Sequence, residues 1–210
     1  MTHPSHPTRL HRHPLSGHAH RAQLMLSLLN VPTELVDVNL AAAEHKSPAF
    51  LARNAFGQLP VLEIDGTVLA DSNAILVYLA STRDPQRQWW PEDARTQAEV
   101  QRWLSVSAGQ LAHGPAAARL VNVFKRPPNP AAVATAENLF GVMDQHLSRQ
   151  PWLAADHATL ADIALYTYTA HAPEGGIDLG RWPHIQAWLA RIEALPGFVG
   201  MQRSPLPTEA

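Results

Sequence analysis

The sequence predicts an α/β domain followed by an all-α domain, each large enough to enclose a hydrophobic core. Three observations support this prediction. Strand and helix patterns alternate through residues 1–84, strand signals stop after Trp89-Trp90-Pro91, and the remaining sequence places apolar residues at helical spacing. We therefore place the domains at residues 1–84 and 91–210.

The first domain begins with a strand, a helix and a second strand. Residues 9–13 alternate weakly before a proline, residues 19–30 carry alanine, leucine and methionine at helical intervals, and residues 33–38 alternate again. Because strand-helix-strand connections are right-handed crossovers, we expect these two strands to be parallel.

A short helix and a hairpin follow. Ser47 is a predicted cap with Pro48 at the first helical position. The apolar run at residues 61–64 and its return at residues 68–69 flank Asp65-Gly66, which is a strong hairpin signal because glycine adopts positive φ without steric cost.

The first domain closes with a helix whose N-terminal signal is Asp71-Ser72 and which fades at Asp84-Pro85. The predicted order of the domain is therefore βαβαββα.

The second domain is predicted to be entirely helical. Three prolines interrupt the helical pattern at residues 125–130, and Thr159 with Asp162 resembles a capping box that carries aspartate in place of glutamate. The predicted helices cover residues 92–123 and 131–149, a stretch that the capping box begins and that runs through Ile163, Leu165 and Tyr166 before the break at Gly175-Gly176, and residues 183–194.

Charge and hydropathy exclude some partners. A net charge of −2 over 210 residues gives no field that would attract nucleic acid or an anionic membrane. No apolar run approaches the length of a membrane span, and residues 1–13 lack the apolar core of a secretory signal. We therefore expect no nucleic acid and no membrane as partner, and a cytoplasmic location.

The residue types also limit the kinds of site that the chain can form. The chain has no cysteine, which excludes disulfides, thiolate metal sites and a cysteine nucleophile. Histidines are frequent near the N-terminus, but their spacing is irregular and does not place two rings on one helical face, so we expect no metal site. The six early histidines are His3, His6, His11, His13, His18 and His20.

Several motifs together resemble the cytosolic glutathione S-transferases, and the similarity is greatest to the phi-like serine-type and bacterial members. The resemblance covers residues 9 to about 200 and implies a thioredoxin-like N-terminal domain followed by a helical bundle. The motifs are Ser16-Gly17, His45-Lys46-Ser47-Pro48-x-Phe50-Leu51, Asn54-x-x-Gly57-Gln58-Leu59-Pro60-Val61-Leu62, Asp71-Ser72-x-Ala74-Ile75 and Thr159-Leu160-Ala161-Asp162.

The resemblance implies a site for glutathione, used as a co-substrate. Asp71 and Ser72 would meet the ammonium and carboxylate of the γ-glutamyl residue at a helix N-terminus, although capping alone explains both residues. A cis Leu59-Pro60 bond would present the Leu59 backbone to the cysteinyl residue. The glycyl carboxylate would be held by His45, Lys46 and Gln58.

Ser16 is the proposed catalytic residue, because a hydroxyl donor at a helix N-terminus would stabilise the glutathione thiolate. A simple helix cap explains Ser16 equally well. His18, Arg12 and His13 are alternative donors. Tyrosine-type members use a tyrosine on the first strand, and this chain has none before Tyr78.

The predicted function is conjugation of glutathione to a small apolar electrophile. Glutathione-dependent peroxidase or disulfide reductase activity, or a non-catalytic interaction role, are the alternatives. His113, Arg119 and Trp103 are candidates for the electrophile pocket. The resemblance further implies a homodimer.

Overall fold

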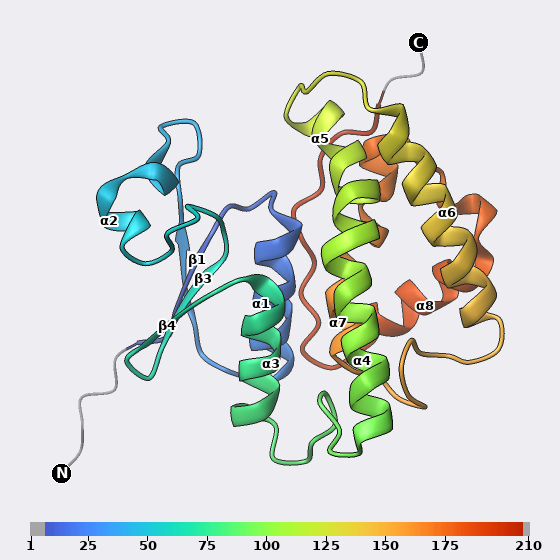
Figure 1. Cartoon of the computed structure of the whole chain (residues 1–210), viewed down its shortest axis with the longest axis horizontal. Coiled ribbons are helices and arrows are strands. Elements are labelled where there is room, and N and C mark those ends of the chain that lie inside the picture. The colour runs from blue at the N-terminus through green and yellow to red at the C-terminus, as the bar shows by residue number, and fades with distance from the viewer. Residues whose placement is uncertain (1–6, 208–210) are drawn as a thin grey trace. The chain divides into compact units, whose positions relative to one another are not determined.

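The computed structural model describes residues 7–207, so His3, His6 and the end of the tail lie outside the described residues. The chain divides into two compact units (Figure 1). The first contains the chain up to Pro85 together with Pro196–Met201, and the second contains Gln86–Leu195 and the residues from Gln202 onward. A short C-terminal segment therefore belongs with the N-terminal unit, which the sequence patterns do not indicate.

The first unit is built on a four-stranded sheet with the order β2-β1-β3-β4. β1 and β2 are parallel, as the crossover rule predicts, and β3 runs antiparallel to both β1 and β4. Leu10 lies opposite Leu35 on one side and Leu62 on the other. The strands are β1 (Arg9–Arg12), β2 (Glu34–Asp37), β3 (Val61–Ile64) and β4 (Thr67–Ala70).

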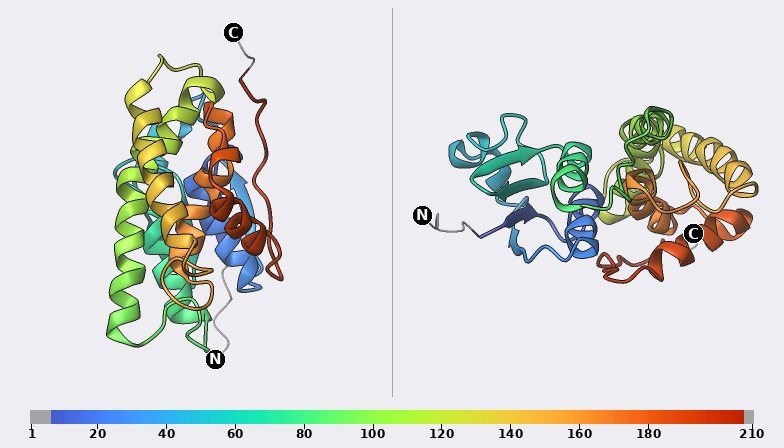
Figure 2. Two further views of the ribbon diagram at one scale, coloured as in Figure 1. Left: turned by 90° about the vertical axis from the view of Figure 1, so that its right-hand side faces the viewer. Right: turned by 90° about the horizontal axis from the view of Figure 1, so that it is seen from below.

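Helices cover both faces of this sheet. α1 (Gly17–Leu28) and α3 (Ser72–Arg83) lie side by side on one face, and α2 (Pro48–Leu51) lies on the other (Figures 1 and 2). α1 begins at Gly17 with Ser16 as its cap, as the capping interpretation of Ser16 predicts, two residues before the first residue of the apolar pattern. Fully buried apolar side chains fill the space beneath α1 and α3, among them Leu10, Leu24, Met25, Leu62, Ile75 and Leu79.

Two glycines on either side of β3 have positive φ, the region that favours glycine. Asp65 and Gly66 have φ of 50° and 76°, the positive pair expected for an Asp-Gly hairpin turn. Gly57 has φ of 58°, and a Cβ there would lie 2.7 Å from the His45 carbonyl oxygen. The loop before β3 is therefore packed against the segment that carries His45.

The second unit is helical throughout its regular structure. None of the helices in residues 7–207 is long and apolar enough to cross a membrane. The helices are α4 (Ala94–Val106), a π-helical stretch (Ser107–Ala116), α5 (Ala117–Val123), α6 (Pro130–Leu147), α7 (Leu160–Ala170) and α8 (Pro183–Glu193), with single 3₁₀ turns at Ala172–Gly175 and Leu179–Arg181.

The predicted helix over residues 92–123 is continuous but not α-helical throughout. Its middle third is π-helical, and this stretch contains Pro115, which has no N–H to donate to the carbonyl four residues earlier. α6 packs along the stretch (Figures 1 and 2). Contact is close at Gly114, where a Cβ would approach the Ala136 nitrogen to 2.9 Å.

The predicted capping box heads α7. The Thr159 side chain accepts from the backbone of the first turn, and the Asp162 carboxylate accepts from the Thr159 N–H at 2.8 Å. Asp162 is fully buried and also accepts from the Leu153 N–H at 3.0 Å and the Trp188 Nε1–H at 2.8 Å. The box therefore ties α7 to the preceding loop and to α8.

Candidate functional site

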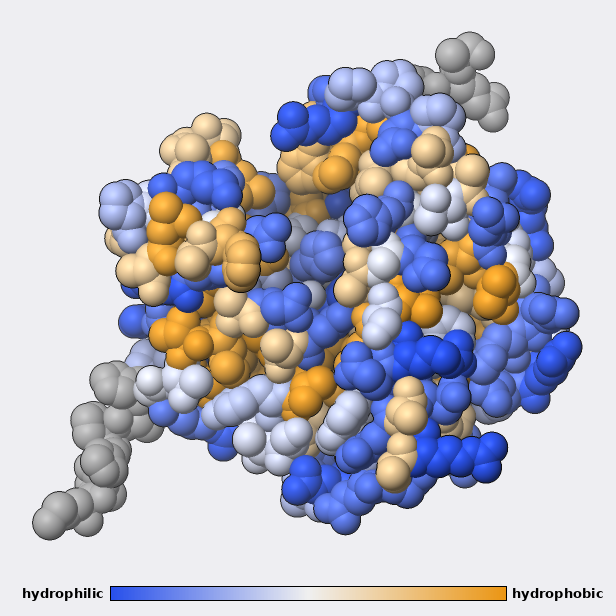
Figure 3. Space-filling model, viewed as in Figure 1, coloured by the Kyte–Doolittle hydropathy of each residue, from blue (hydrophilic) through white to orange (hydrophobic). Residues whose placement is uncertain are grey.

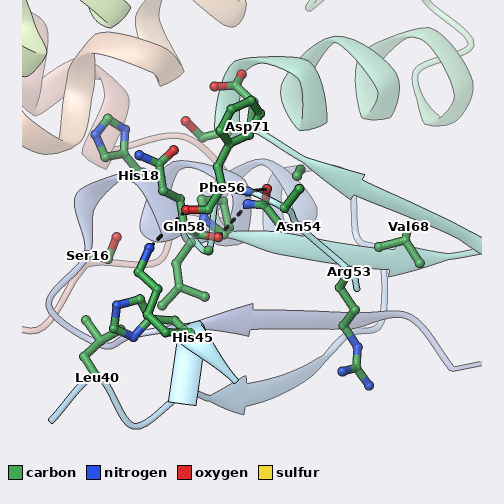
Figure 4. A pocket seen from close by; sticks show the side chains of 17 residues that line it. Ser16, His18, Leu40, His45, Arg53, Asn54, Phe56, Gln58, Val68 and Asp71 are labelled. Atoms are coloured by element: carbon green, nitrogen blue, oxygen red, sulfur yellow. Dashed lines mark hydrogen bonds between the residues drawn. The ribbon is translucent and has the colours of Figure 1, made fainter. Parts of the chain in front are cut away.

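The first unit carries a pocket of about 830 Å³, formed by the N-terminal ends of α1 and α3, the loop around α2, and the end of β4 (Figure 4). All seven residues assigned from the sequence line it, although they come from separate parts of the chain. They are Ser16, His45, Lys46, Gln58, Leu59, Asp71 and Ser72.

Ser16 is the cap of α1. Its Oγ accepts a hydrogen bond from the Ala19 N–H at 3.3 Å. A hydroxyl that accepts through its oxygen still has its own hydrogen to donate. Helix capping and donation to a ligand are therefore compatible at Ser16.

Asp71 caps α3, and Ser72 is the first residue of that helix. Asp71 Oδ1 accepts from the Asn73 and Ala74 N–H groups, both at 2.9 Å, and Asp71 has φ of 71°. Ser72 is 5% exposed yet lines the pocket. The N-terminus of α3, where the helix dipole favours anions, is therefore part of the pocket.

The loop before β3 forms the opposite part of the lining. The Leu59-Pro60 bond is cis, as the sequence resemblance implies. The Lys46 ammonium donates to the Phe56 carbonyl at 3.1 Å, so one of its three donors is already engaged. Asn54, a buried side chain to which the sequence assigns no role, donates to the Gln58 carbonyl at 2.9 Å and accepts from the Phe56 N–H at 3.1 Å.

His45 contributes an unsatisfied polar atom. Its Nδ1 is buried and has no hydrogen-bond partner among the described residues. Buried polar atoms are rarely left without a partner, because desolvation then goes uncompensated. A polar ligand in the pocket could satisfy His45.

The three alternative donors have different surroundings. His18 lines the pocket (Figure 4), and burial, aided by the Arg21 charge, lowers the pKa of His18 to about 3, so its imidazole is neutral at pH 7. Arg12 is bound to Asp37 at 2.9 Å and to Gln23 at 2.9 Å. His13 Nδ1 accepts from a backbone N–H nearby. Of these three, His18 is the one that lines the pocket.

Arg53 is a second pocket residue that the sequence does not single out. Its guanidinium is directed away from the group formed by Ser16, His45 and Gln58 (Figure 4), and its Nε donates to Glu63 at 2.8 Å. The ion pair explains this orientation, so Arg53 contributes to the wall of the pocket through its stem.

The candidates for the electrophile pocket are largely explained by packing within the second unit. Trp103 is 1% exposed, and its Nε1–H donates to the Leu153 carbonyl at 2.8 Å. Arg119 is 2% exposed and donates to Glu174 at 2.5 Å. His113 is exposed on the π-helical stretch and bonds to the Gly109 carbonyl.

Within residues 7–207 no group of three or more histidine, aspartate and glutamate side chains is arranged to hold a metal ion.

Two family models match the chain. The model of the "Glutathione S-transferase, N-terminal domain" matches residues 7–81, and that of the "Glutathione S-transferase, C-terminal domain" matches residues 107–196. The first match contains every residue of the pocket lining.

Relatives and solved structures agree with these matches. The chain is 34% identical to glutathione S-transferase 3 of Zea mays, over 91% of each chain. It is 31% identical to human glutathione S-transferase theta-2, over 80% of this chain and 72% of that one. A crystal structure of a glutathione S-transferase from Pseudomonas fluorescens superimposes with a TM-score of 0.87 at 35% identity, over 93% of this chain and 99% of that one.

Proposed function

The chain belongs to the glutathione S-transferase family, and from this premise we propose that its pocket binds glutathione and that it conjugates the thiolate to a small apolar electrophile. One observation carries the proposal. The pocket combines the N-termini of α1 and α3 with an unsatisfied His45 nitrogen, and glutathione is a ligand with a carboxylate at each end and a thiol between them.

The ends of the tripeptide have separate partners in this proposal. The γ-glutamyl carboxylate meets Ser72 and the N–H groups of α3, and its ammonium meets the Asp71 oxygen that does not cap the helix. The glycyl carboxylate meets Lys46, Gln58 and His45, where it satisfies Nδ1. Lys46 also retains donors beyond its bond to the loop.

The cysteinyl residue lies between these ends, with its backbone against Leu59 and its sulfur near Ser16. A free thiol has a pKa of about 8.5, so a donor that stabilises the thiolate raises the fraction of nucleophile at neutral pH. With an aryl halide, the thiol proton goes to solvent and the sulfur lone pair forms the new carbon-sulfur bond. The halide then leaves with the electron pair of the broken bond.

Two assays test the proposal. Calorimetry with glutathione should show saturable binding at millimolar concentrations or below, and chlorodinitrobenzene with glutathione should give a conjugate faster than the uncatalysed reaction. Absence of both would make the proposal wrong. Conversion of glutathione to its disulfide by a hydroperoxide, without conjugation, would instead assign the peroxidase alternative, and binding without either reaction would assign the non-catalytic one.

We also propose that the enzyme is a homodimer, as the sequence resemblance implies. The first unit exposes large apolar side chains among its polar surface groups (Figure 3). Phe56, in the loop before β3, is 80% exposed, and Val68, on the edge strand β4, is 47% exposed. Light scattering should give about twice the mass of the chain, and Phe56→Ser should lower it. A monomer at micromolar concentration would contradict the proposal.

The cytoplasmic location stays a prediction.

A further inference from the structure

Arg21 is a buried cation in α1 that contacts the beginning of α3. It is 1% exposed, and its Nη1 donates to Asn73 Oδ1 at 2.9 Å, with a longer contact to Ser72 Oγ at 3.5 Å. Ser72 and Asn73 form the first turn of α3. Arg21 therefore joins the two helices at the end where both contribute to the pocket.

This connection has a geometric consequence. Ser16 caps α1 and Ser72 begins α3, and both line the pocket. A guanidinium is planar and offers several donors in a rigid fork, so a bond from it restricts both distance and orientation. The separation of the two serines is thus restrained by a side chain that does not itself line the pocket.

The charge of Arg21 also favours binding of an anion at the start of α3. A guanidinium below the first turn of α3 adds to the positive end of that helix dipole, which favours an anion there. The same charge assists burial in lowering the pKa of His18 to about 3, and His18 lies one turn before Arg21 on α1. Arg21 is therefore electrostatically coupled to both helix starts.

We propose that Arg21 is a positioning residue of the glutathione pocket, which holds Ser72 and the first turn of α3 in place for the γ-glutamyl group. The inference rests on the proposed function, because it concerns the affinity of that same pocket. Arg21 is thus expected to affect binding of the γ-glutamyl group, and His45, Lys46 and Gln58 to bind the glycyl carboxylate.

Steady-state kinetics with two thiols test the inference. Arg21→Met should raise KM for glutathione about tenfold, the effect of losing a hydrogen bond to a charged group, and should change kcat by less than about threefold. γ-Glutamylcysteine lacks the glycyl residue, so the ratio of its KM to that of glutathione reports on the glycyl end alone. This ratio should stay unchanged. Arg21→Lys should give an intermediate KM, because it keeps the charge and loses the fork.

Arg119→Lys is the matched control, since Arg119 is equally buried but belongs to the second unit. Arg119→Lys should lower Tm without changing KM for glutathione. Either of two results for Arg21→Met would overturn the inference. One is an unchanged KM for glutathione. The other is a ratio of the γ-glutamylcysteine KM to the glutathione KM that moves toward one, which would show that the contacts to the glycyl residue are lost as well. If Arg21→Met does not fold, Arg21→Lys and Asn73→Ala are judged by the same criteria. Wild-type enzyme that does not bind glutathione would refute the proposed function instead.

Discussion

The Ser16 hydroxyl accepts from the Ala19 N–H as a helix cap and has its own hydrogen to donate. Ser16→Ala should therefore lower kcat about a hundredfold, as expected for the loss of a hydrogen bond to a developing or full anion. The KM for glutathione should change little. Loss of the cap should also lower the free energy of unfolding by about 1 kcal/mol. Steady-state kinetics with glutathione and an aryl halide measure the first two effects.

Two variants separate catalysis from capping. Ser16→Thr keeps the hydroxyl and should keep most of the activity. Asp93→Ala removes an equivalent cap, because Asp93 accepts from the Thr96 N–H at 2.9 Å at the start of α4, and it should leave kcat unchanged. Full turnover by Ser16→Ala would assign the hydrogen bond to the thiolate sulfur to His18 or to the backbone instead.

Gly57 is a second residue whose identity matters. A Cβ at position 57 would meet the His45 carbonyl at 2.7 Å and the Lys46 Nζ at 2.8 Å, and φ is 58°. Gly57→Ala should lower the free energy of unfolding by about 1–3 kcal/mol and weaken glutathione binding by displacing His45. Urea denaturation and calorimetry measure the two effects. Gly66→Ala, which has positive φ but open space around it, is the control and should affect stability only.

The sequence motifs alone assigned seven residues to one site, and all seven line the same pocket. Asn54 and Arg21 received no assignment, although each holds pocket residues in place through hydrogen bonds of 2.9 Å. The partner of Arg21 is Asn73, 52 residues along the chain, and no periodicity or local motif encodes that contact, because it exists only after the chain has folded. The Asn54 bonds are local, to residues two and four positions later, and lie within a motif that the sequence shows without revealing the role of the asparagine.

The start of α7 is held in place by one buried side chain, Asp162. Asp162 accepts from its own cap residue, from the Leu153 N–H and from the Trp188 indole. Burial raises the pKa of Asp162 above its usual value, against the lowering effect of these donors. Asp162→Ala would leave the buried donors unpaired and should lower the free energy of unfolding by about 3 kcal/mol.

Denaturation in urea, followed by circular dichroism, measures this loss. Asp156→Ala is the control, because Asp156 is an exposed carboxylate that bonds to the neighbouring His157. It should leave the denaturation midpoint unchanged. Equal midpoints for the two variants would show that the Asp162 network contributes little.

The helix over residues 94–123 shows where an element-scale prediction fails. Apolar spacing predicts a helix but does not distinguish an α-helix from a π-helix over ten residues. The change in hydrogen-bond pattern accompanies Pro115 and the close approach of α6 at Gly114. The first is visible in the sequence, and the second depends on how two helices pack.

The stability of the whole molecule should depend on pH through a buried cluster in the second unit. Glu174, 3% exposed, binds Arg119 through one oxygen and through the other binds His171 Nδ1 at 2.6 Å and the Ser204 N–H at 3.0 Å. Burial lowers the pKa of His171, although its bond to Glu174 opposes this. For Glu174, burial acts to raise the pKa, but the Ser204, His171 and Arg119 donors lower it overall.

Both shifts make the protein less stable in acid. The unfolded chain takes up a proton at His171 as pH falls through about 6.5, while the folded chain resists it, so stability decreases below that pH. His18 acts in the same way. Glu174 adds a second decrease as pH falls through about 4.5, where the unfolded carboxylate protonates.

Urea midpoints at pH 7.5, 6 and 5 measure this dependence, and they should fall as the pH decreases. His171→Asn removes one titrating group and should give a smaller fall between pH 7.5 and 5. An identical pH dependence in wild type and His171→Asn would exclude His171 as a contributor.

The sequence alone determined the two-unit division of α/β and helical structure, the order of strands and helices, and the family. These follow from local periodicity, capping and turn residues, each of which acts over a few positions. Only the tertiary structure decided three further features. They are the place of Pro196–Met201 in the first unit, the hydrogen bond from Arg21 to Asn73 and the buried cluster around Glu174. Each joins groups that are distant in sequence, so it depends on packing and desolvation that arise only when the core closes.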